Sequence, residues 1–232
     1  MATRMTVQLF ATCLGDLVFP TAVADAEALL REAGHEVIFP RQQICCGQPA
    51  YNAGHRSAAR RVAKTFARAF ASDLPVVVPS GSCTTMLSHY LPELLGSKPY
   101  DVWELSAFLD QHGAEVPHRN EGRVVAYHDS CHMLRELRIA DAPRRLLERS
   151  GAEVRDLPRP DLCCGFGGTF STRQPEVSVA MADDKLAGAI GIAALVTADP
   201  GCLMQLGGRS ARTSGPRVLH LATALARGVD AG

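Results

Sequence analysis

The chain has 232 residues, of which 47% are hydrophobic and 21% are charged, and its 24 basic residues balance its 24 acidic ones. This length supports one large domain or two small ones with a hydrophobic core, and the neutral balance argues against a nucleic-acid-binding protein. No apolar run approaches the roughly 20 residues that span a bilayer, and the first ten residues read as a strand rather than as a signal peptide. We therefore expect a cytoplasmic protein without a transmembrane segment, whose cysteines stay reduced unless they hold metal.

In the first half of the chain, short apolar runs alternate with longer stretches of helical composition. Strands are predicted at residues 7–10, 36–39 and 75–78, and helices at residues 22–33, 54–71, 84–95 and 102–112. Cys13 and Cys83 lie just past the ends of the first and third of these strands.

A polar stretch at residues 113–122 is interpreted as a linker, after which the pattern restarts. Strands are predicted at residues 124–127, 153–158 and 192–196, helices at residues 143–150 and 175–186, and a last strand and helix within residues 217–227. The halves correspond at an offset of about 118 residues, which indicates an internal duplication. The sequence thus predicts an α/β fold with a first repeat at residues 1–112 and a second at residues 123–232. Each repeat is a small parallel sheet with flanking helices.

All eight cysteines fit this duplication. Each half has an adjacent pair followed by glycine, one cysteine 32 residues before the pair, and one cysteine 37 or 38 residues after it. The two sets are Cys13, Cys45, Cys46 and Cys83, and Cys131, Cys163, Cys164 and Cys202. Open parallel sheets place their binding sites at the carboxyl ends of their strands. We therefore expect each set of four cysteines to converge from loops at that edge.

Thiolates are soft ligands that suit zinc, copper(I) or iron–sulfur clusters. Structural zinc sites normally use cysteines two to four residues apart, and this chain has no such pair. Adjacent cysteines point in different directions, so they grip an extended cluster more easily than a single ion. The pattern favours iron–sulfur clusters. A zinc-stabilised interaction module, a thiol–disulfide enzyme and buried metal-free cysteines are the alternatives.

Four segments carry a resemblance to a known family: residues 10–16, residues 45–50, residues 79–83 and the glycine-rich residues 163–171. They resemble the signatures of cysteine-rich (CCG) domain proteins, and among these the lactate utilization protein A family. That family is related to the cysteine-rich subunit of heterodisulfide reductase and to the iron–sulfur subunit of glycolate oxidase.

The resemblance implies that the eight cysteines hold two iron–sulfur clusters. It also implies an electron-transfer subunit of an oxidoreductase complex that converts L-lactate to pyruvate without NAD. Two partner proteins are implied, one of them also iron–sulfur-binding. An iron–sulfur subunit of a glycolate or other 2-hydroxy-acid oxidase is the alternative within this class.

One departure from the heterodisulfide reductase pattern bears on the type of cluster. There, each repeat ends in Cys-x-x-Cys and supplies five thiolates to a non-cubane cluster. Here, Ser80 and Asp199 occupy the first position of that pair. Four thiolates are the complement of an ordinary [4Fe–4S] cluster. A non-cubane cluster is the alternative. Ser80 or Asp199 either supplies an oxygen ligand or serves only as a turn residue or helix cap.

Further candidates occur only in the second half. His128, Asp129 and His132 flank Cys131, and Arg173 follows the glycine-rich loop. A histidine at such a place can replace a cysteine ligand, hydrogen-bond a cluster sulfur or carry a proton, and an arginine can bind a carboxylate. Each also suits an ordinary loop or surface role. Any catalytic chemistry beyond electron transfer is therefore expected in the second half.

Overall fold

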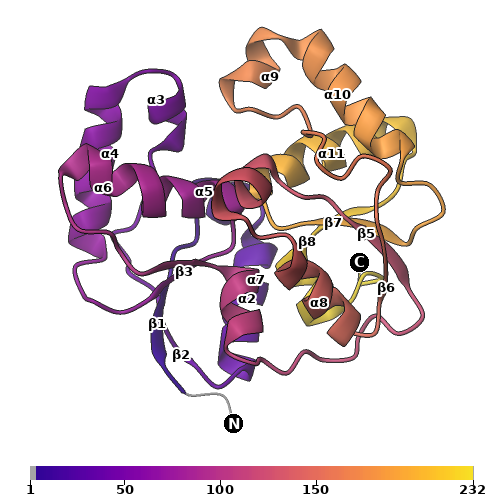
Figure 1. The fold of residues 1–232 in the computed structure, drawn as a ribbon, viewed down its shortest axis with the longest axis horizontal. Coiled ribbons are helices and arrows are strands. Elements are labelled where there is room, and N and C mark those ends of the chain that lie inside the picture. The colour runs from indigo at the N-terminus through magenta and orange to yellow at the C-terminus, as the bar shows by residue number, and fades with distance from the viewer. Residues whose placement is uncertain (1–3, 232) are drawn as a thin grey trace. The chain divides into compact units, whose positions relative to one another are not determined.

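The computed structural model describes residues 4–231, and the chain divides into two compact units, Met1–Glu115 and Val116–Gly232. Each unit has its own four-stranded parallel sheet with helices on both faces (Figure 1). This confirms the predicted fold class and the duplication. The boundary lies within the stretch interpreted as a linker, and residues 116–122 belong to the second unit.

The sheet of the first unit has the strand order β2-β1-β3-β4, and every neighbouring pair is parallel. Its strands are β1 (Thr6–Leu9), β2 (Glu36–Ile38), β3 (Val76–Val78) and β4 (Val102–Glu104). Its helices are α1 (Cys13–Val18), α2 (Pro20–Glu32), α3 (Gln48–Asn52), α4 (Arg56–Ala69), α5 (Gly81–Thr85), the π-helical turn η1 (Met86–Tyr90), α6 (Leu91–Leu95) and α7 (Leu105–Gln111).

The second unit repeats this order as β6-β5-β7-β8, again with parallel pairs only. Its strands are β5 (Val124–Tyr127), β6 (Glu153–Arg155), β7 (Ala194–Thr197) and β8 (Val218–His220). Its helices are the π-helical turn η2 (Met133–Leu137), α8 (Asp141–Arg149), α9 (Thr169–Arg173), α10 (Pro175–Ala187), α11 (Pro200–Thr213) and α12 (Leu221–Arg227).

Several elements differ from the expectation, among them the short helices α1, α3 and α9 and the turn η2, which were not predicted. The helix predicted over residues 102–112 is wrong at its start, because Val102 and Trp103 pair with β3 and form the fourth strand. Helix α11 was not predicted, although Asp199 caps it and Pro200 occupies its first position, which are both start signals.

The strand order determines where a site can form. The central strands β1, β3, β5 and β7 are mostly buried apolar residues, as expected for parallel strands covered on both faces. From β1 the chain moves first to β2 on one side and then to β3 on the other. The carboxyl ends of β1 and β3 therefore form a topological switch point, where open α/β sheets leave a crevice. The same holds for β5 and β7.

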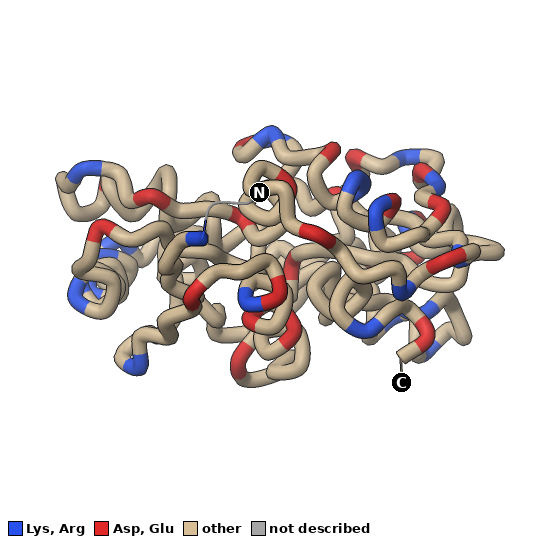
Figure 2. The backbone as a smooth tube through the Cα atoms, turned by 90° about the horizontal axis from the view of Figure 1, so that it is seen from below, with Lys and Arg blue, Asp and Glu red and all other residues tan. Residues whose placement is uncertain are grey.

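The charged residues are mixed over most of the chain. Basic and acidic residues are interspersed in Figure 2, except along α4, whose sequence carries basic side chains and no acidic ones. Within residues 4–231, none of the helices is both long and apolar enough to cross a membrane.

Asn120 fastens the start of the second unit to its last helix. The side chain is fully buried, and its amide nitrogen donates to Ser150 Oγ at 2.8 Å and to the carbonyl of Ala224 at 2.9 Å. Its amide oxygen accepts the N–H of Val229 at 2.8 Å. One side chain thus joins three segments that are far apart in the sequence.

We expect Asn120→Ala to lower the free energy of unfolding by about 2–4 kcal/mol, because it leaves the buried N–H of Val229 without its partner and removes the hydrogen bonds to Ser150 and to the carbonyl of Ala224. Chemical denaturation followed by circular dichroism measures the loss. The exposed neighbour provides a control, since Glu121→Ala should stay within about 0.5 kcal/mol of the wild type. Equal stability of the two variants would show that Asn120 does not hold these segments.

Candidate metal centre

In the first unit, four sulfurs meet at the switch point. Cys13 begins α1 directly after β1, Cys83 lies in the first turn of α5 after β3, and Cys45 and Cys46 follow β2. The sulfurs of Cys13 and Cys45 are 3.6 Å apart, and the thiols of Cys45 and Cys83 lie close enough to that of Cys46 to raise its pKa. The four thiols therefore form one continuous chain of contacts, which we call the first centre.

The second centre has the same arrangement. The thiols of Cys131 and Cys164 lie close enough to Cys163 to lower its pKa, and the sulfurs of Cys164 and Cys202 are 3.2 Å apart. Cys202 lies in the first turn of α11, and Cys131 in the helical turn before η2. The predicted convergence of four cysteines is thus present in each unit. The expectation that every cysteine lies in a loop is wrong, because the single cysteines open helical turns.

The four cysteines of each set differ in their exposure to solvent and in the pKa of their thiols. Cys46, Cys83, Cys164 and Cys202 are buried, whereas the other four cysteines are partly exposed. Hydrogen bonds from neighbouring thiols lower the pKa of Cys45 to about 3 and that of Cys163 to about 2. The hydrogen bonds to these two sulfurs, together with burial, raise the pKa of Cys13 and of Cys131. Each centre thus favours a thiolate at the first cysteine of its adjacent pair.

A glycine shapes the loop at each adjacent pair. Gly47 and Gly165 adopt φ angles of 93° and 87°, which side-chain-bearing residues rarely take. This conformation directs each N–H to the sulfur two residues earlier, at 3.4 Å from Cys45 and from Cys163. The two glycines differ in the room available for a side chain, because a Cβ on Gly165 would lie 2.5 Å from the carbonyl oxygen of Ser178.

Ser80 and Asp199 cap the helices that carry the last cysteine of each set. Ser80 Oγ accepts the N–H of Cys83 at 3.3 Å, and Asp199 Oδ1 accepts the N–H of Gly201 at 3.0 Å. Both residues are buried, and the carboxylate of Asp199 is close enough to raise the pKa of Cys131. These contacts support the cap interpretation, and the carboxylate of Asp199 also lies close enough to raise the pKa of Cys202.

Asp129 and His132 have partners of their own. Arg144 donates through two nitrogens to both carboxylate oxygens of Asp129, each at 2.8 Å. His132 Nδ1 lies 2.6 Å from the carboxylate of Glu136, one turn along the chain. Arg173 is exposed at the end of α9. Asp129 therefore anchors the loop that carries Cys131, and it is not oriented as a free catalytic base.

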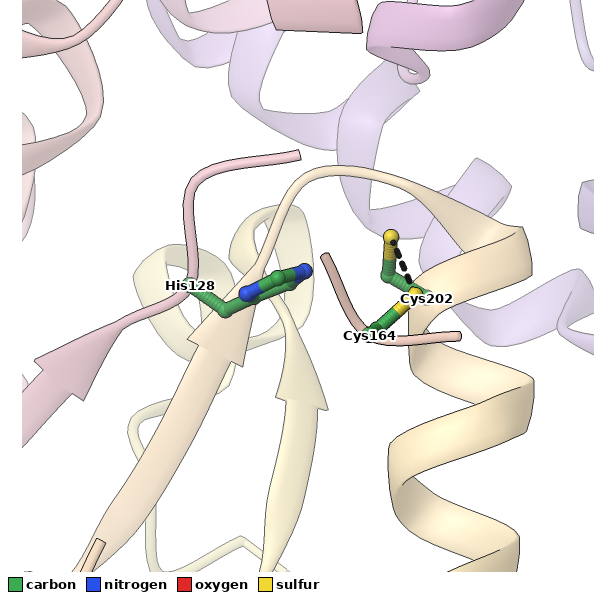
Figure 3. Close-up of side chains that lie close together, drawn as sticks. All are labelled: His128, Cys164 and Cys202. Atoms are coloured by element: carbon green, nitrogen blue, oxygen red, sulfur yellow. Dashed lines mark hydrogen bonds between the residues drawn. The ribbon is translucent and has the colours of Figure 1, made fainter. Parts of the chain in front are cut away.

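His128 is different. It is fully buried, and neither of its ring nitrogens has a hydrogen-bond partner among residues 4–231. Burial and the nearby Lys185 lower the pKa of His128 to about 3, so its imidazole is neutral. A ring nitrogen and the sulfurs of Cys164 and Cys202 all lie within 4.8 Å of one another, and Figure 3 shows the ring directed toward these cysteines.

Lys185 was not predicted as a site residue. It lies on α10 with only 2% of its surface exposed, and its ammonium donates to the carbonyls of Arg159 and Pro160 at 2.8 and 2.9 Å. These carbonyls belong to the loop that leads to Cys163, so Lys185 fixes that loop. The sequence signal for Lys185 is a charged residue at a position where the periodicity of the helix calls for an apolar one.

The residues fit a sulfur-ligated metal group. Four convergent sulfurs form a soft donor set in each unit, one of them stabilised as a thiolate. Glycine N–H groups already point to sulfur, as they do around iron–sulfur clusters, where such hydrogen bonds tune the potential. The second centre adds a buried imidazole whose nitrogens lack partners within the described chain.

Comparison with known proteins agrees with this geometry. The model of the CCG cysteine-rich domain matches residues 7–88 and again residues 125–207. Lactate utilization protein A of Halalkalibacterium halodurans is 41% identical over 238 residues, which cover 95% of this chain and 96% of that protein. The chain belongs to the lactate utilization protein A family. Another member, lactate utilization protein A 2 of Bacillus cereus (strain 03BB102), is 38% identical over 245 residues and covers 97% of this chain and 100% of the relative.

A solved structure shares the fold. The crystal structure of a hypothetical protein from Helicobacter pylori aligns with a TM-score of 0.62 at 13% identity, covering 98% of this chain and half of that chain. At this identity the likeness concerns the fold alone. The family membership confirms the resemblance drawn from the cysteine motifs.

The two glycines of the adjacent-cysteine loops give a matched prediction. Gly47→Ala should lower the free energy of unfolding by about 1–2 kcal/mol, the cost of a left-handed backbone at a non-glycine residue. Gly165→Ala should add an overpacking cost of about 1–3 kcal/mol, because its methyl group meets the backbone of Ser178. Denaturant unfolding of the two metal-free variants measures the difference. A larger loss for Gly47→Ala would contradict the geometry of the second loop.

Proposed function

We propose that the protein is an iron–sulfur electron-transfer subunit of a system that oxidises L-lactate to pyruvate. The observation that carries this proposal is the convergence of four sulfurs at the switch point of each unit. In this proposal, each centre holds one cluster of the [4Fe–4S] type. The two sets of ligands are Cys13, Cys45, Cys46 and Cys83, and Cys131, Cys163, Cys164 and Cys202.

The chemistry of the donor set supports iron–sulfur clusters over a single ion. The sulfurs lie on separate segments in each unit, and the adjacent cysteines make contacts to different neighbours. Four thiolates complete a [4Fe–4S] cluster, which supplies one-electron transfer. The chain itself binds the cluster, buries two of its four sulfur ligands and directs a glycine N–H group toward one of the others.

The substrate assignment rests on family membership. The relatives in Bacillus cereus and Halalkalibacterium halodurans carry lactate utilization in their names and align over nearly their whole length. We infer the same role for this chain, in the cytoplasm and with two partner proteins, one of them also iron–sulfur-binding. Substrate oxidation then takes place within the assembled complex, without NAD. A complex that oxidises glycolate or another 2-hydroxy acid is the related alternative.

Metal analysis tests the cofactor. The protein purified without oxygen should be brown and contain about eight irons with matching acid-labile sulfide, as two [4Fe–4S] clusters require. Cys164→Ser removes one ligand of the second centre and should leave about four irons, while the exposed-surface control Lys64→Ala keeps all of them. A colourless protein with stoichiometric zinc would contradict the proposal. Loss of iron from both centres in Cys164→Ser would contradict their independence.

Growth tests the substrate. A host strain that lacks this gene should fail to grow on L-lactate as sole carbon source, and a plasmid copy of the wild type or of Lys64→Ala should restore growth. Copies with Cys46→Ser or Cys164→Ser should not, because each lacks a ligand of one centre. Normal growth of the deletion strain on L-lactate, with failure on glycolate instead, would move the role to the alternative substrate.

A further inference from the structure

The two repeats place different residues at one position beside the sulfurs. The backbone N–H of Phe10 donates to the carbonyl of Val77 at 2.9 Å, and that of His128 donates to the carbonyl of Val196 at 2.8 Å. Both residues are three positions before the first cysteine of their set and follow the first strand of their unit. Phe10 and His128 are therefore structural equivalents, and both are fully buried.

A second pair of equivalents lies on the helix that covers this position. Helices α4 and α10, with the residues just after them, bury side chains at the same spacing: Ala59, Ala63, Phe66 and Phe70 in the first unit, and Ser178, Ala182, Lys185 and Ala189 in the second. The glycines of the two cysteine loops support this alignment, because Gly47 faces Ala59 and Gly165 faces Ser178. Lys185 therefore takes the place of Phe66.

The first unit fills this place with aromatic rings. The ring of Phe10 lies 5.7 Å from that of Phe66 and 5.6 Å from that of Phe70, and the three rings share a core cluster with Cys46 and Cys83. The inner side of the first centre is thus closed by hydrocarbon. None of these rings offers a lone pair to a metal.

The second unit replaces this packing with polar groups. The ammonium of Lys185 is used by the carbonyls of Arg159 and Pro160, and as a cation it is no acceptor for an imidazole N–H. Among residues 4–231, nothing hydrogen-bonds to the ring of His128. Leaving a buried polar group without a hydrogen-bond partner costs about 1–3 kcal/mol of stability. We therefore expect the imidazole of His128 to have a partner that is not part of the chain.

The sulfurs show where that partner lies. The structure contains another buried histidine without hydrogen-bond partners for its ring, His35, but it packs against the ring of Phe108 at 5.1 Å. His128 instead shares a 4.8 Å cluster with the sulfurs of Cys164 and Cys202 (Figure 3). Imidazole and thiolate together are a common donor set for iron and zinc.

We propose that His128 is a nitrogen ligand of the metal group in the second repeat. A [4Fe–4S] cluster takes one ligand on each of its four irons, so His128 then replaces one of the four cysteines of the second centre, while the first centre is held by cysteine alone. This inference rests on the proposed function, because it takes the group to be an iron–sulfur cluster. Histidine ligation of iron raises the reduction potential of such a cluster. The second centre should therefore be reduced at a higher potential than the first.

Pulsed electron paramagnetic resonance on protein labelled with ¹⁵N at histidine alone tests the ligand directly. Cys46→Ser serves as the background, because it depletes the first centre and leaves the signal of the second. The reduced second centre should show a strong ¹⁵N coupling. His128→Phe, which copies the residue of the first repeat, should lose this coupling and lower the potential of the second centre. The matched control His35→Phe should keep both.

The outcomes separate the two proposals. An iron- and sulfide-containing protein with no ¹⁵N coupling, or with only the weak coupling of a hydrogen-bonded histidine, would overturn the ligand assignment and leave the proposed function standing. A coupling that survives in His128→Phe would also overturn it. A protein without iron and sulfide would overturn the proposed function and this inference with it. If His128→Phe does not fold, the absence of a strong ¹⁵N coupling in the labelled background protein still overturns the assignment.

Discussion

Both centres depend on one requirement: sulfurs that are more than 30 residues apart in the sequence must come to the same point. A parallel sheet with strand order 2-1-3-4 meets this requirement with little extra structure. Its two central strands end side by side, and the helical turn that follows each strand carries a cysteine. The edge strand then needs only to deliver the adjacent pair, and a left-handed glycine turns the loop so that both sulfurs reach the site.

The duplication shows which parts of this arrangement are free to change. The sulfurs, the capping residue before the last cysteine and the turn glycine are present in both units. The wall behind the sulfurs is not the same, since Phe10 and Phe66 in one unit correspond to His128 and Lys185 in the other. The lysine is kept in the interior by two carbonyls of the loop that carries Cys163. One backbone thus presents an apolar wall in one repeat and a polar wall in the other.

Much of this was predictable from the sequence, because the decisive signals are local. Buried parallel strands appear as short apolar runs, and the nearly equal cysteine spacings in the two halves indicate both the duplication and the convergence of the sulfurs. The missing parts depend on contacts between remote segments. Helix α11 contains Gly201, Gly207 and Gly208, whose low helix propensity hides it, and it is stabilised by its packing on β7 and β8. The first residues of the predicted helix at 102–112 become a strand because β3 offers a free edge. The Asp129–Arg144 pair depends on tertiary placement that no local pattern encodes, and Lys185 has only one local signal, a charged residue at a buried position of a helix.

The unequal exposure of the cysteines has a consequence for how such a site is filled and emptied. In each unit the first cysteine and the first member of the adjacent pair are partly exposed, and the other two lie in the core. An incoming metal group, a chelator or an oxidant therefore meets Cys13 and Cys45, or Cys131 and Cys163, before it reaches the inner sulfurs. Cluster assembly and oxidative damage therefore both begin at the two exposed cysteines of each unit. The two buried cysteines are the last to bind the metal group and the last to release it.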